Sequence, residues 1–153
     1  MSAPLLPDAP AVELVLDANV LIAAQNPAEP HQDEALSLLD EGAAMRWRLH
    51  PLTRTELLVL PARVGGAEAA RGYARSLLSF GIEPEPGCPA ADLADPDAQI
   101  ELATLRAEIG LRLPDAAVLH LVISLGAALA TRDTRLARAA DERGVEVLRG
   151  RPS

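Results

Sequence analysis

At 153 residues the chain is long enough for one compact domain, whose core must consist of Leu, Val, Ile and Ala because only 2% of residues are aromatic. A net charge of −8 argues against a nucleic-acid partner unless acidic side chains surround metal ions, because phosphate contacts need positive charge. All 14 basic residues are Arg, which excludes folds that hold a phosphoryl group with lysine: Walker phosphate loops, response-regulator receivers and phosphatases of the haloacid dehalogenase type.

We expect residues 1–10, with three prolines, to form a flexible lead-in to a single domain over residues 11–153. Cys88 is the only cysteine, so an intramolecular disulfide is impossible, which suits a reducing cytoplasm. The N-terminus lacks the basic and apolar segments of a secretion signal. The longest charge-free run, 116–131, is too short to span a membrane. These features together predict a soluble cytoplasmic protein.

In the first third of the domain, strand and helix patterns alternate. Apolar residues at odd and even positions alike predict a strand buried on both faces, while strict alternation with Arg predicts a second strand. Apolar residues three and four apart, ended by proline or glycine, predict the intervening helices. We expect a strand at 11–16, helices at 20–24 and 30–41, and a strand at 44–50.

The remaining chain continues the same alternation, with helix starts and stops that are easier to read. Asp95-Pro96 predicts an N-cap followed by proline at the first helical position, and Gly126 predicts a helix C-terminus. We expect helices from 53 to a bend or end at Pro61, at 67–80, from 96, at 114–125 and at 134–142, strands at 127–130 and 145–148, and a long loop at 84–92. Strands alternating with helices predict an α/β fold with a mostly parallel central sheet and helices on both faces.

Four acidic residues lie at helix N-termini or at junctions between strands and helices: Asp17, Glu56, Asp115 and Asp133. Each also has a purely local interpretation. Asp17 and Asp133 can cap helices, and Asp115 can interact with a helix dipole. Glu56 can complete a capping box with Thr53. The residues taken singly do not choose between these interpretations and a functional one.

Taken together, the four acids indicate a metal site. The carboxyl ends of parallel strands share one edge of a sheet, so acids placed there from separate units converge in space. Converging carboxylates repel one another unless some are protonated or a cation intervenes. Oxygen ligands without Cys or His favour Mg²⁺ or Mn²⁺ over zinc. Asn19 would then orient the Asp17 carboxylate or a water on the metal.

The chain resembles PIN domains, in particular the VapC-type toxins of bacterial toxin–antitoxin pairs. The segments that carry the resemblance are Leu16-Asp17-Ala18-Asn19-Val20-Leu21, Thr55-Glu56-Leu57-Leu58, Leu113-Pro114-Asp115-Ala116 and Ala130-Thr131-Arg132-Asp133, and they cover about residues 11–148. Each segment is short and common, but four of them in this order are fairly specific. The resemblance implies a PIN-like three-layer α/β/α fold and a metal-dependent endoribonuclease.

The resemblance also implies roles for individual residues. Asp17 and Asp115 would be the principal metal ligands, and Asp133 would complete the acidic cluster. Glu56 would bind the metal through water or act as base for the attacking water. Thr131 would line the pocket, and Asn19 would support Asp17. The implied partners are RNA as substrate, an antitoxin whose tail covers the cleft, and a second copy of the chain in a homodimer.

Some observations depart from this picture or leave alternatives open. Leu119 and His120 stand where the family usually has small residues, and we expect His120 to be a core or interface histidine. The alternatives to a ribonuclease are a PIN-like domain that binds metal or a partner without catalysis, and a structure-specific DNA nuclease. The arginines available for phosphate contacts are Arg46, Arg48, Arg54, Arg63, Arg71, Arg75 and Arg112.

Overall fold

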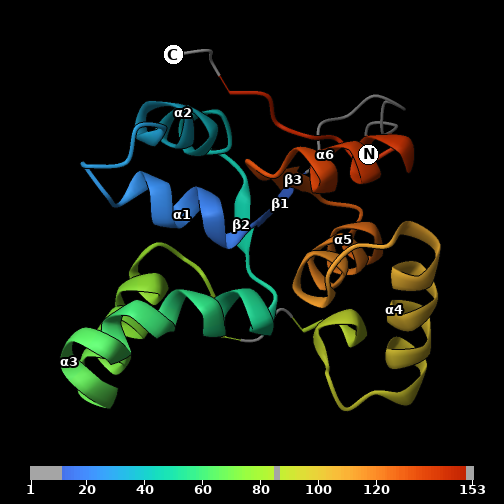
Figure 1. Cartoon of the computed structure of the whole chain (residues 1–153), viewed down its shortest axis with the longest axis horizontal. Coiled ribbons are helices and arrows are strands. Elements are labelled where there is room, and N and C mark those ends of the chain that lie inside the picture. The colour runs from blue at the N-terminus through green and yellow to red at the C-terminus, as the bar shows by residue number, and fades with distance from the viewer. Residues whose placement is uncertain (1–11, 85–86, 151–153) are drawn as a thin grey trace, which may run out of the picture.

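The centre of the molecule is a sheet of three parallel strands. The computed structural model describes residues 12–84 and 87–150, so the predicted lead-in over residues 1–10 lies outside the described residues. The strands are β1 (Glu13–Leu16), β2 (Arg46–Arg48) and β3 (Ala128–Ala130), in the order β2-β1-β3 (Figure 1). The prediction of an α/β fold around a parallel sheet is confirmed.

One face of the sheet is covered by the helices from the first half of the chain. These are α1 (Ala18–Ala24), α2 (Gln32–Glu41) and α3 (Pro51–Ser79). They bury Leu14 and Leu16 of β1 in a shared apolar core. Successive side chains of a strand point to opposite faces, so these two even-numbered residues lie on the same side.

The opposite face is covered by the second half of the chain. It contains the short 3₁₀ helix η1 (Pro89–Ala91) and the helices α4 (Pro96–Ile109), α5 (Leu113–Leu125) and α6 (Thr134–Glu142). They pack with Val15 of β1 and Leu129 of β3 into a second core. Because both faces of β1 are buried, the continuous apolar run expected for such a strand is observed. The three-layer arrangement expected from the PIN resemblance is therefore present.

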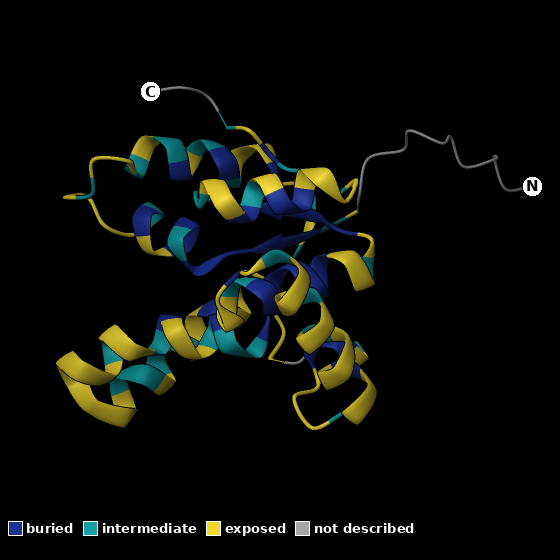
Figure 2. Cartoon of the chain, turned by 45° about the vertical axis from the view of Figure 1, so that its right-hand side comes forward, coloured by how far each residue is buried: buried dark blue, intermediate teal, exposed yellow. Residues whose placement is uncertain are grey.

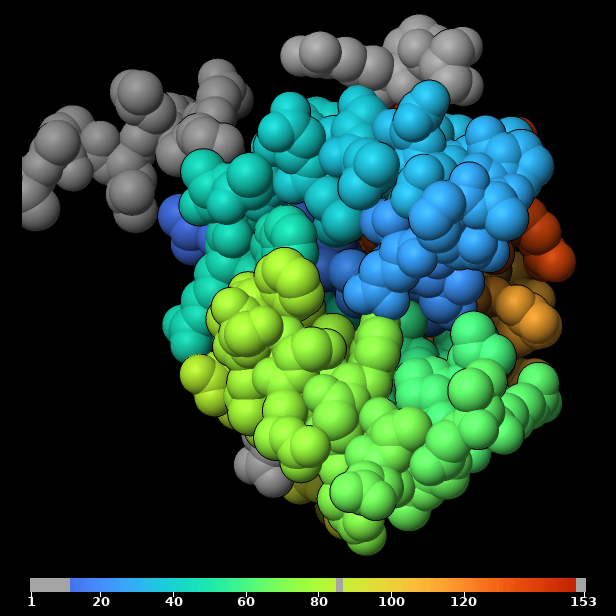
Figure 3. All heavy atoms as spheres, turned by 90° about the vertical axis from the view of Figure 1, so that its left-hand side faces the viewer, coloured from blue at the N-terminus to red at the C-terminus, as the bar shows by residue number. Residues whose placement is uncertain are grey.

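The third helix differs most from the sequence-based expectation. We expected a helix from Thr53 that Pro61 bends or ends, followed by a separate helix, whereas α3 begins at Pro51 and continues past Pro61. Its helical conformation is broken at Gly65 and Gly66. Gly66 has φ +69° and ψ −166°, a region essentially restricted to glycine. The second half of α3 therefore folds back beside the first, and this helix forms the lower half of the face seen in Figure 3.

The other boundaries shift by a few residues. The strand expected at 44–50 spans Arg46–Arg48, and the helices expected at 20–24 and 30–41 begin at Ala18 and Gln32. The strand expected at 145–148 is wrong as a regular element, because only a single parallel bridge joins Val147 to Leu129. The helix expected at 134–142 has those bounds.

The outer half of α3 and α4 project away from the sheet, and their outward-facing residues are largely exposed (Figure 2). Over residues 12–84 and 87–150, no helix is both long enough and apolar enough to cross a lipid bilayer.

Candidate active site

Asp17 occupies the carboxyl end of the central strand. It follows β1 directly and is the N-cap of α1, and its Oδ1 accepts a hydrogen bond from the Ala18 amide at 2.8 Å. The residue is only 7% exposed although it carries a carboxylate. A helix cap does not require such deep burial, so capping alone does not account for the position of Asp17.

Thr131 connects the β1 corner to the β3 corner. Its hydroxyl donates to Asp17 Oδ2 at 2.7 Å and accepts from the Asp133 amide at 3.0 Å. A second bond between the same corners runs from the Arg132 amide to Asn19 Oδ1, at 3.1 Å. Asn19 thus holds the 131–133 segment in place, whereas the sequence suggested that it orients Asp17 or a water. Two hydrogen bonds therefore join the loops that follow β1 and β3.

The charges of Asp115 and Glu56 act on Asp17. The pKa of Asp17 is raised from 3.8 to about 6, mainly by burial, and the nearby carboxylates of Asp115 and Glu56 contribute to this rise. The hydrogen bonds from Thr131 and Ala18 lower the same pKa and offset part of this effect. Asp115 lies in the first turn of α5 and Glu56 in the second turn of α3. Acids from two other elements therefore lie near enough to Asp17 for their charges to act on it.

Asp133 is placed less directly. It is the N-cap of α6, and its Oδ1 accepts from the amides of Arg135 and Leu136 at 2.9 and 3.2 Å. Its charge is not among the causes that shift the pKa of Asp17. The local interpretation of Asp133 as a helix cap is confirmed, and its second carboxylate oxygen, Oδ2, is not engaged in capping.

The capping-box interpretation of Glu56 is wrong. The N-cap of α3 is His50, whose side chain accepts from the Leu52 amide at 3.0 Å, so the helix starts before Thr53. Thr53 is already inside the helix and Glu56 lies beyond its first turn. Glu56 is exposed. No capping role accounts for this carboxylate, whose charge acts on Asp17.

The donor set suits a hard divalent cation. It consists of carboxylate oxygens, and the repulsion that raises the pKa of Asp17 is the kind that a cation relieves. Within the described part of the chain, no three His, Cys, Asp or Glu side chains are gathered closely enough to hold an ion by themselves. Mg²⁺ commonly uses one or two protein carboxylates and keeps several waters, so a site for this ion does not require three such side chains.

Two arginines counted as possible phosphate contacts have other partners. Arg48 is only 8% exposed and lies 3.3 Å from Glu13, so the structure contradicts a solvent-facing role. Arg112 Nε lies 3.5 Å from Asp115 Oδ2, and the Arg112 side chain is 81% exposed. Arg112 and Asp115 are three residues apart at the start of a helix, and this spacing could have revealed their ion pair from the sequence.

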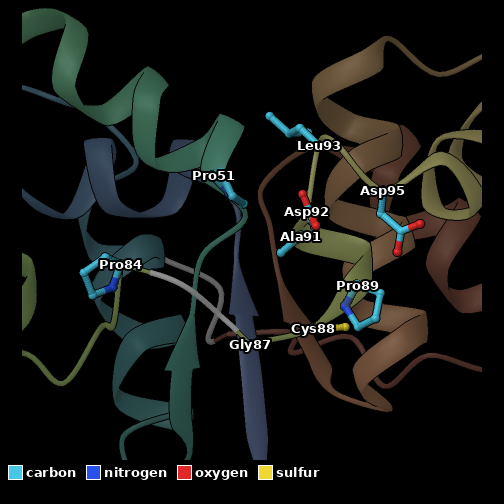
Figure 4. Close-up of a pocket in the computed structure, with 9 residues that line it drawn as sticks. All are labelled: Pro51, Pro84, Gly87, Cys88, Pro89, Ala91, Asp92, Leu93 and Asp95. Carbon is cyan, nitrogen blue, oxygen red and sulfur yellow. The ribbon is translucent and has the colours of Figure 1, made fainter.

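One cavity of about 730 Å³ lies apart from the acids (Figure 4). It opens between Pro51, at the start of α3, and the segment from Cys88 to Asp95 around η1. None of the four acids lines it. The candidate site is therefore the set of loops at the carboxyl edge of the sheet and not this cavity.

Comparisons with known proteins agree with the fold. The PIN domain family model matches residues 14–142. Among solved structures, FitAcB from Neisseria gonorrhoeae is similar with a TM-score of 0.59 and 20% identity, covering 88% of this chain and 96% of that one. PAE2754 from Pyrobaculum aerophilum is similar with a TM-score of 0.53 and 22% identity, covering 97% and 93%.

A comparison with curated protein sequences gives no significant match. PIN domains are generally metal-dependent nucleases. The family match spans β1 to α6 and includes all four acids singled out from the sequence. The chain belongs to the PIN domain family.

Proposed function

We propose that this chain is a Mg²⁺- or Mn²⁺-dependent endoribonuclease that hydrolyses RNA phosphodiester bonds, and the VapC-type toxin of a toxin–antitoxin pair. The observation that carries the proposal is the buried Asp17 carboxylate, on which the charges of Asp115 and Glu56 converge. Burying an ionised group beside like charges is costly, and a domain of this size tolerates it where the site binds a cation.

In this proposal Asp17 and Asp115 hold the metal and Asp133 completes the acidic cluster. The bound cation supplies Lewis-acid activation of water and neutralises charge on the phosphate. The Ala18 amide and the Thr131 hydroxyl fix the Asp17 carboxylate in one orientation. Glu56 accepts a proton from the attacking water as its oxygen bonds to phosphorus, one ester P–O bond breaks, and the leaving oxygen takes a proton from solvent.

The partners that we propose are an antitoxin and a second copy of the chain, in the cytoplasm. Exposed large apolar side chains on the two projecting helices support protein partners, because isolated monomers rarely present such groups together. These side chains include Leu60, Val64 and Ile100, which are 65%, 82% and 64% exposed.

The test compares cleavage of structured RNA by the protein and by Asp17→Ala, with Mg²⁺ or Mn²⁺ and with chelator. We expect cleavage only by the unsubstituted protein with metal present, and a loss of at least about 100-fold in the variant, as for removal of a principal charge-stabilising group. Asp141→Ala, an exposed acid on α6 that pairs with Arg149, is the matched control and should keep full activity.

A second candidate function is binding of metal or a partner without catalysis. It is favoured by the absence, within residues 12–84 and 87–150, of three acids close enough to form a complete ligand set. Folded, inhibitor-free protein that cleaves no RNA or DNA but binds Mn²⁺ through Asp17 would support this function instead. Cleavage of structured DNA but not of RNA would identify a DNA nuclease.

A further inference from the structure

Two histidines outside the acid cluster are buried in the layer that joins α3 to α5. His50 is fully buried and His120 is 6% exposed. Each has one ring nitrogen that makes a hydrogen bond and one, His50 Nε2 or His120 Nδ1, that is buried without a partner. Buried polar atoms are almost always satisfied, so these two atoms require an explanation.

The hydrogen bond to His50 determines which nitrogen carries its proton. The ring caps α3 by accepting from the Leu52 amide through Nδ1, so Nδ1 must be unprotonated. Burial lowers the pKa of His50 to about 4, so the ring is neutral at pH 7 and its proton lies on Nε2. His50 therefore presents a buried N–H donor.

The hydrogen bond of His120 determines the opposite arrangement. Its Nε2 lies 3.0 Å from Oε2 of Glu101 on α4. A carboxylate accepts, so Nε2 donates and carries the proton in the neutral ring. In the tautomer with the proton on Nε2, the buried and unpartnered Nδ1 of His120 can accept a hydrogen bond. The unpaired donor of His50 and the unpaired acceptor of His120 are complementary.

The two rings are also near one another. The charge that His120 carries when protonated lowers the pKa of His50, and α3 packs against α5. The Ala90 carbonyl lies beside the ring and raises the pKa of His50 as a hydrogen-bond acceptor does, although its geometry falls short of a direct bond to Nε2. A donor, an acceptor and a carbonyl are the two to four polar partners that a buried water requires.

We propose that one buried water bridges His50 Nε2–H and His120 Nδ1, with the Ala90 carbonyl as its third partner. The resulting chain of hydrogen bonds runs from the Leu52 amide through both rings to Glu101 and ties the start of α3 to α5 and α4. A metal ion does not fit there, because ligation through His50 Nε2 would put the ring proton on Nδ1, where the Leu52 amide already donates.

The cavity of Figure 4 is lined by residues adjacent in sequence to two of those that would hold the water. That cavity is lined by Pro51 and Ala91, the residues directly after His50 and Ala90. A buried position one residue away from an open cavity can fill during folding and exchange slowly afterwards.

This inference rests on the proposed function where it concerns activity. Glu56 lies six residues after His50 on α3, and Asp115 lies five residues before His120 on α5. The bridge therefore sets the spacing between two helices that each carry a site carboxylate. His50 and His120 act as positioning residues and touch no reacting atom.

The first test is long-range ¹H–¹⁵N spectroscopy of labelled protein at pH 7, with and without His120→Leu. We expect the Nε2–H form for both rings, and slow exchange of the His50 Nε2 proton with solvent. His120→Leu removes the acceptor, and loss of about one hydrogen bond should speed that exchange by roughly tenfold. A crystal structure of the unsubstituted protein should show the water on these three partners.

Surface variants on α4 keep the test informative if His120→Leu does not fold. The side chain of Glu101 is 67% exposed, so its replacement disturbs the core little. Glu101→Gln removes the carboxylate that fixes the His120 tautomer. We expect a mixture of His120 tautomers and a shifted His50 Nε2 proton signal. Glu108→Gln on the same helix, where the acid pairs with Arg143 at 3.4 Å, is the matched control and should leave both signals unchanged.

Unchanged His50 exchange in both His120→Leu and Glu101→Gln would overturn the bridge and leave the Ala90 carbonyl as the sole partner of His50. Equal effects of Glu101→Gln and Glu108→Gln would overturn it as well. On RNA, Glu101→Gln should lower kcat two- to fivefold with KM unchanged. If the protein cleaves no RNA at all, the proposed function fails while the spectroscopic result still decides the bridge.

Discussion

At the scale of single residues, the Asp17 carboxylate has two roles that other proteins often divide between residues. It caps α1 through the Ala18 amide, and it is the buried acid on which the charges of Asp115 and Glu56 act. The choice between a cap and a metal ligand, as posed from the sequence, is therefore not exclusive. A cap alone would not need a carboxylate that is 7% exposed beside two further acids.

The raised pKa of Asp17 predicts how stability depends on pH. The pKa of Asp17 is about 6 in the folded protein and 3.8 in the unfolded chain, so the folded protein binds the Asp17 proton more tightly. Without metal, stability should fall as the pH rises from about 4 to above 6, by about 3 kcal/mol in total. In Asp17→Asn this contribution disappears, so the variant should gain stability relative to the unsubstituted protein over that range.

Denaturant titrations of both proteins in chelator, from pH 4 to pH 8, measure this difference. A difference in unfolding free energy that is constant with pH would contradict the assignment of the titration to Asp17.

Thr131 provides a second test at this scale, because its hydroxyl serves two partners at once. Thr131→Val leaves Asp17 Oδ2 and the Asp133 amide without that partner and should cost about 1–3 kcal/mol. The pKa of Asp17 should rise further, since the Thr131 bond lowers it. Thr131→Ser keeps the hydroxyl, so its stability and RNA cleavage should match those of the unsubstituted protein. Both properties are measured side by side for the two variants and the unsubstituted protein. Failure of Ser to restore them would show that the methyl group matters more than the hydrogen bonds.

At the scale of elements, α3 shows how a local conformation controls tertiary packing. A straight helix of 29 residues would be about 44 Å long and could not return Leu77 to the core that holds Leu57. The break at Gly65 and Gly66 allows this return. Pro61 is also inside α3, but the non-helical backbone is found at the glycines.

Two substitutions on α3 separate the role of the break from general glycine effects. Gly66→Ala places a side chain at φ +69° and ψ −166° and should cost about 1–3 kcal/mol, although no atom lies within 4 Å of the new Cβ. Gly72→Ala lies in the helix, where the nearest atom to the new Cβ is 3.7 Å away, and should stabilise by up to about 1 kcal/mol. Urea unfolding checks both, and equal effects would contradict the need for the break.

At the scale of the whole molecule, the fold places acids from distant parts of an acidic chain on one edge. The chain has a net charge of −8, and part of that charge is concentrated where β1, α3 and α5 begin or end. A divalent cation should therefore stabilise the entire domain and not only its site, because it binds the folded form alone.

We expect Mg²⁺ at about 100 times its Kd to stabilise the unsubstituted protein by about 2.7 kcal/mol. The rise in Tm should be absent in Asp17→Asn and in Asp115→Asn. Thermal scans with Mg²⁺, and with Na⁺ at matched ionic strength, distinguish binding from screening. An equal rise in Tm in Asp17→Asn would place the cation elsewhere.

The sequence by itself determined the parallel α/β fold and, to within a few residues, most helix bounds, because periodicity, Asp95-Pro96 and Gly126 are local signals. It misplaced the start of α3, because the His50 cap depends on a ring buried between helices. It also predicted a last strand at 145–148, where pairing with β3 gives a single bridge. Only the tertiary structure decided that Asp115 and Glu56 act on Asp17 and that Arg48 is buried, because convergence and burial depend on contacts between residues far apart in the chain.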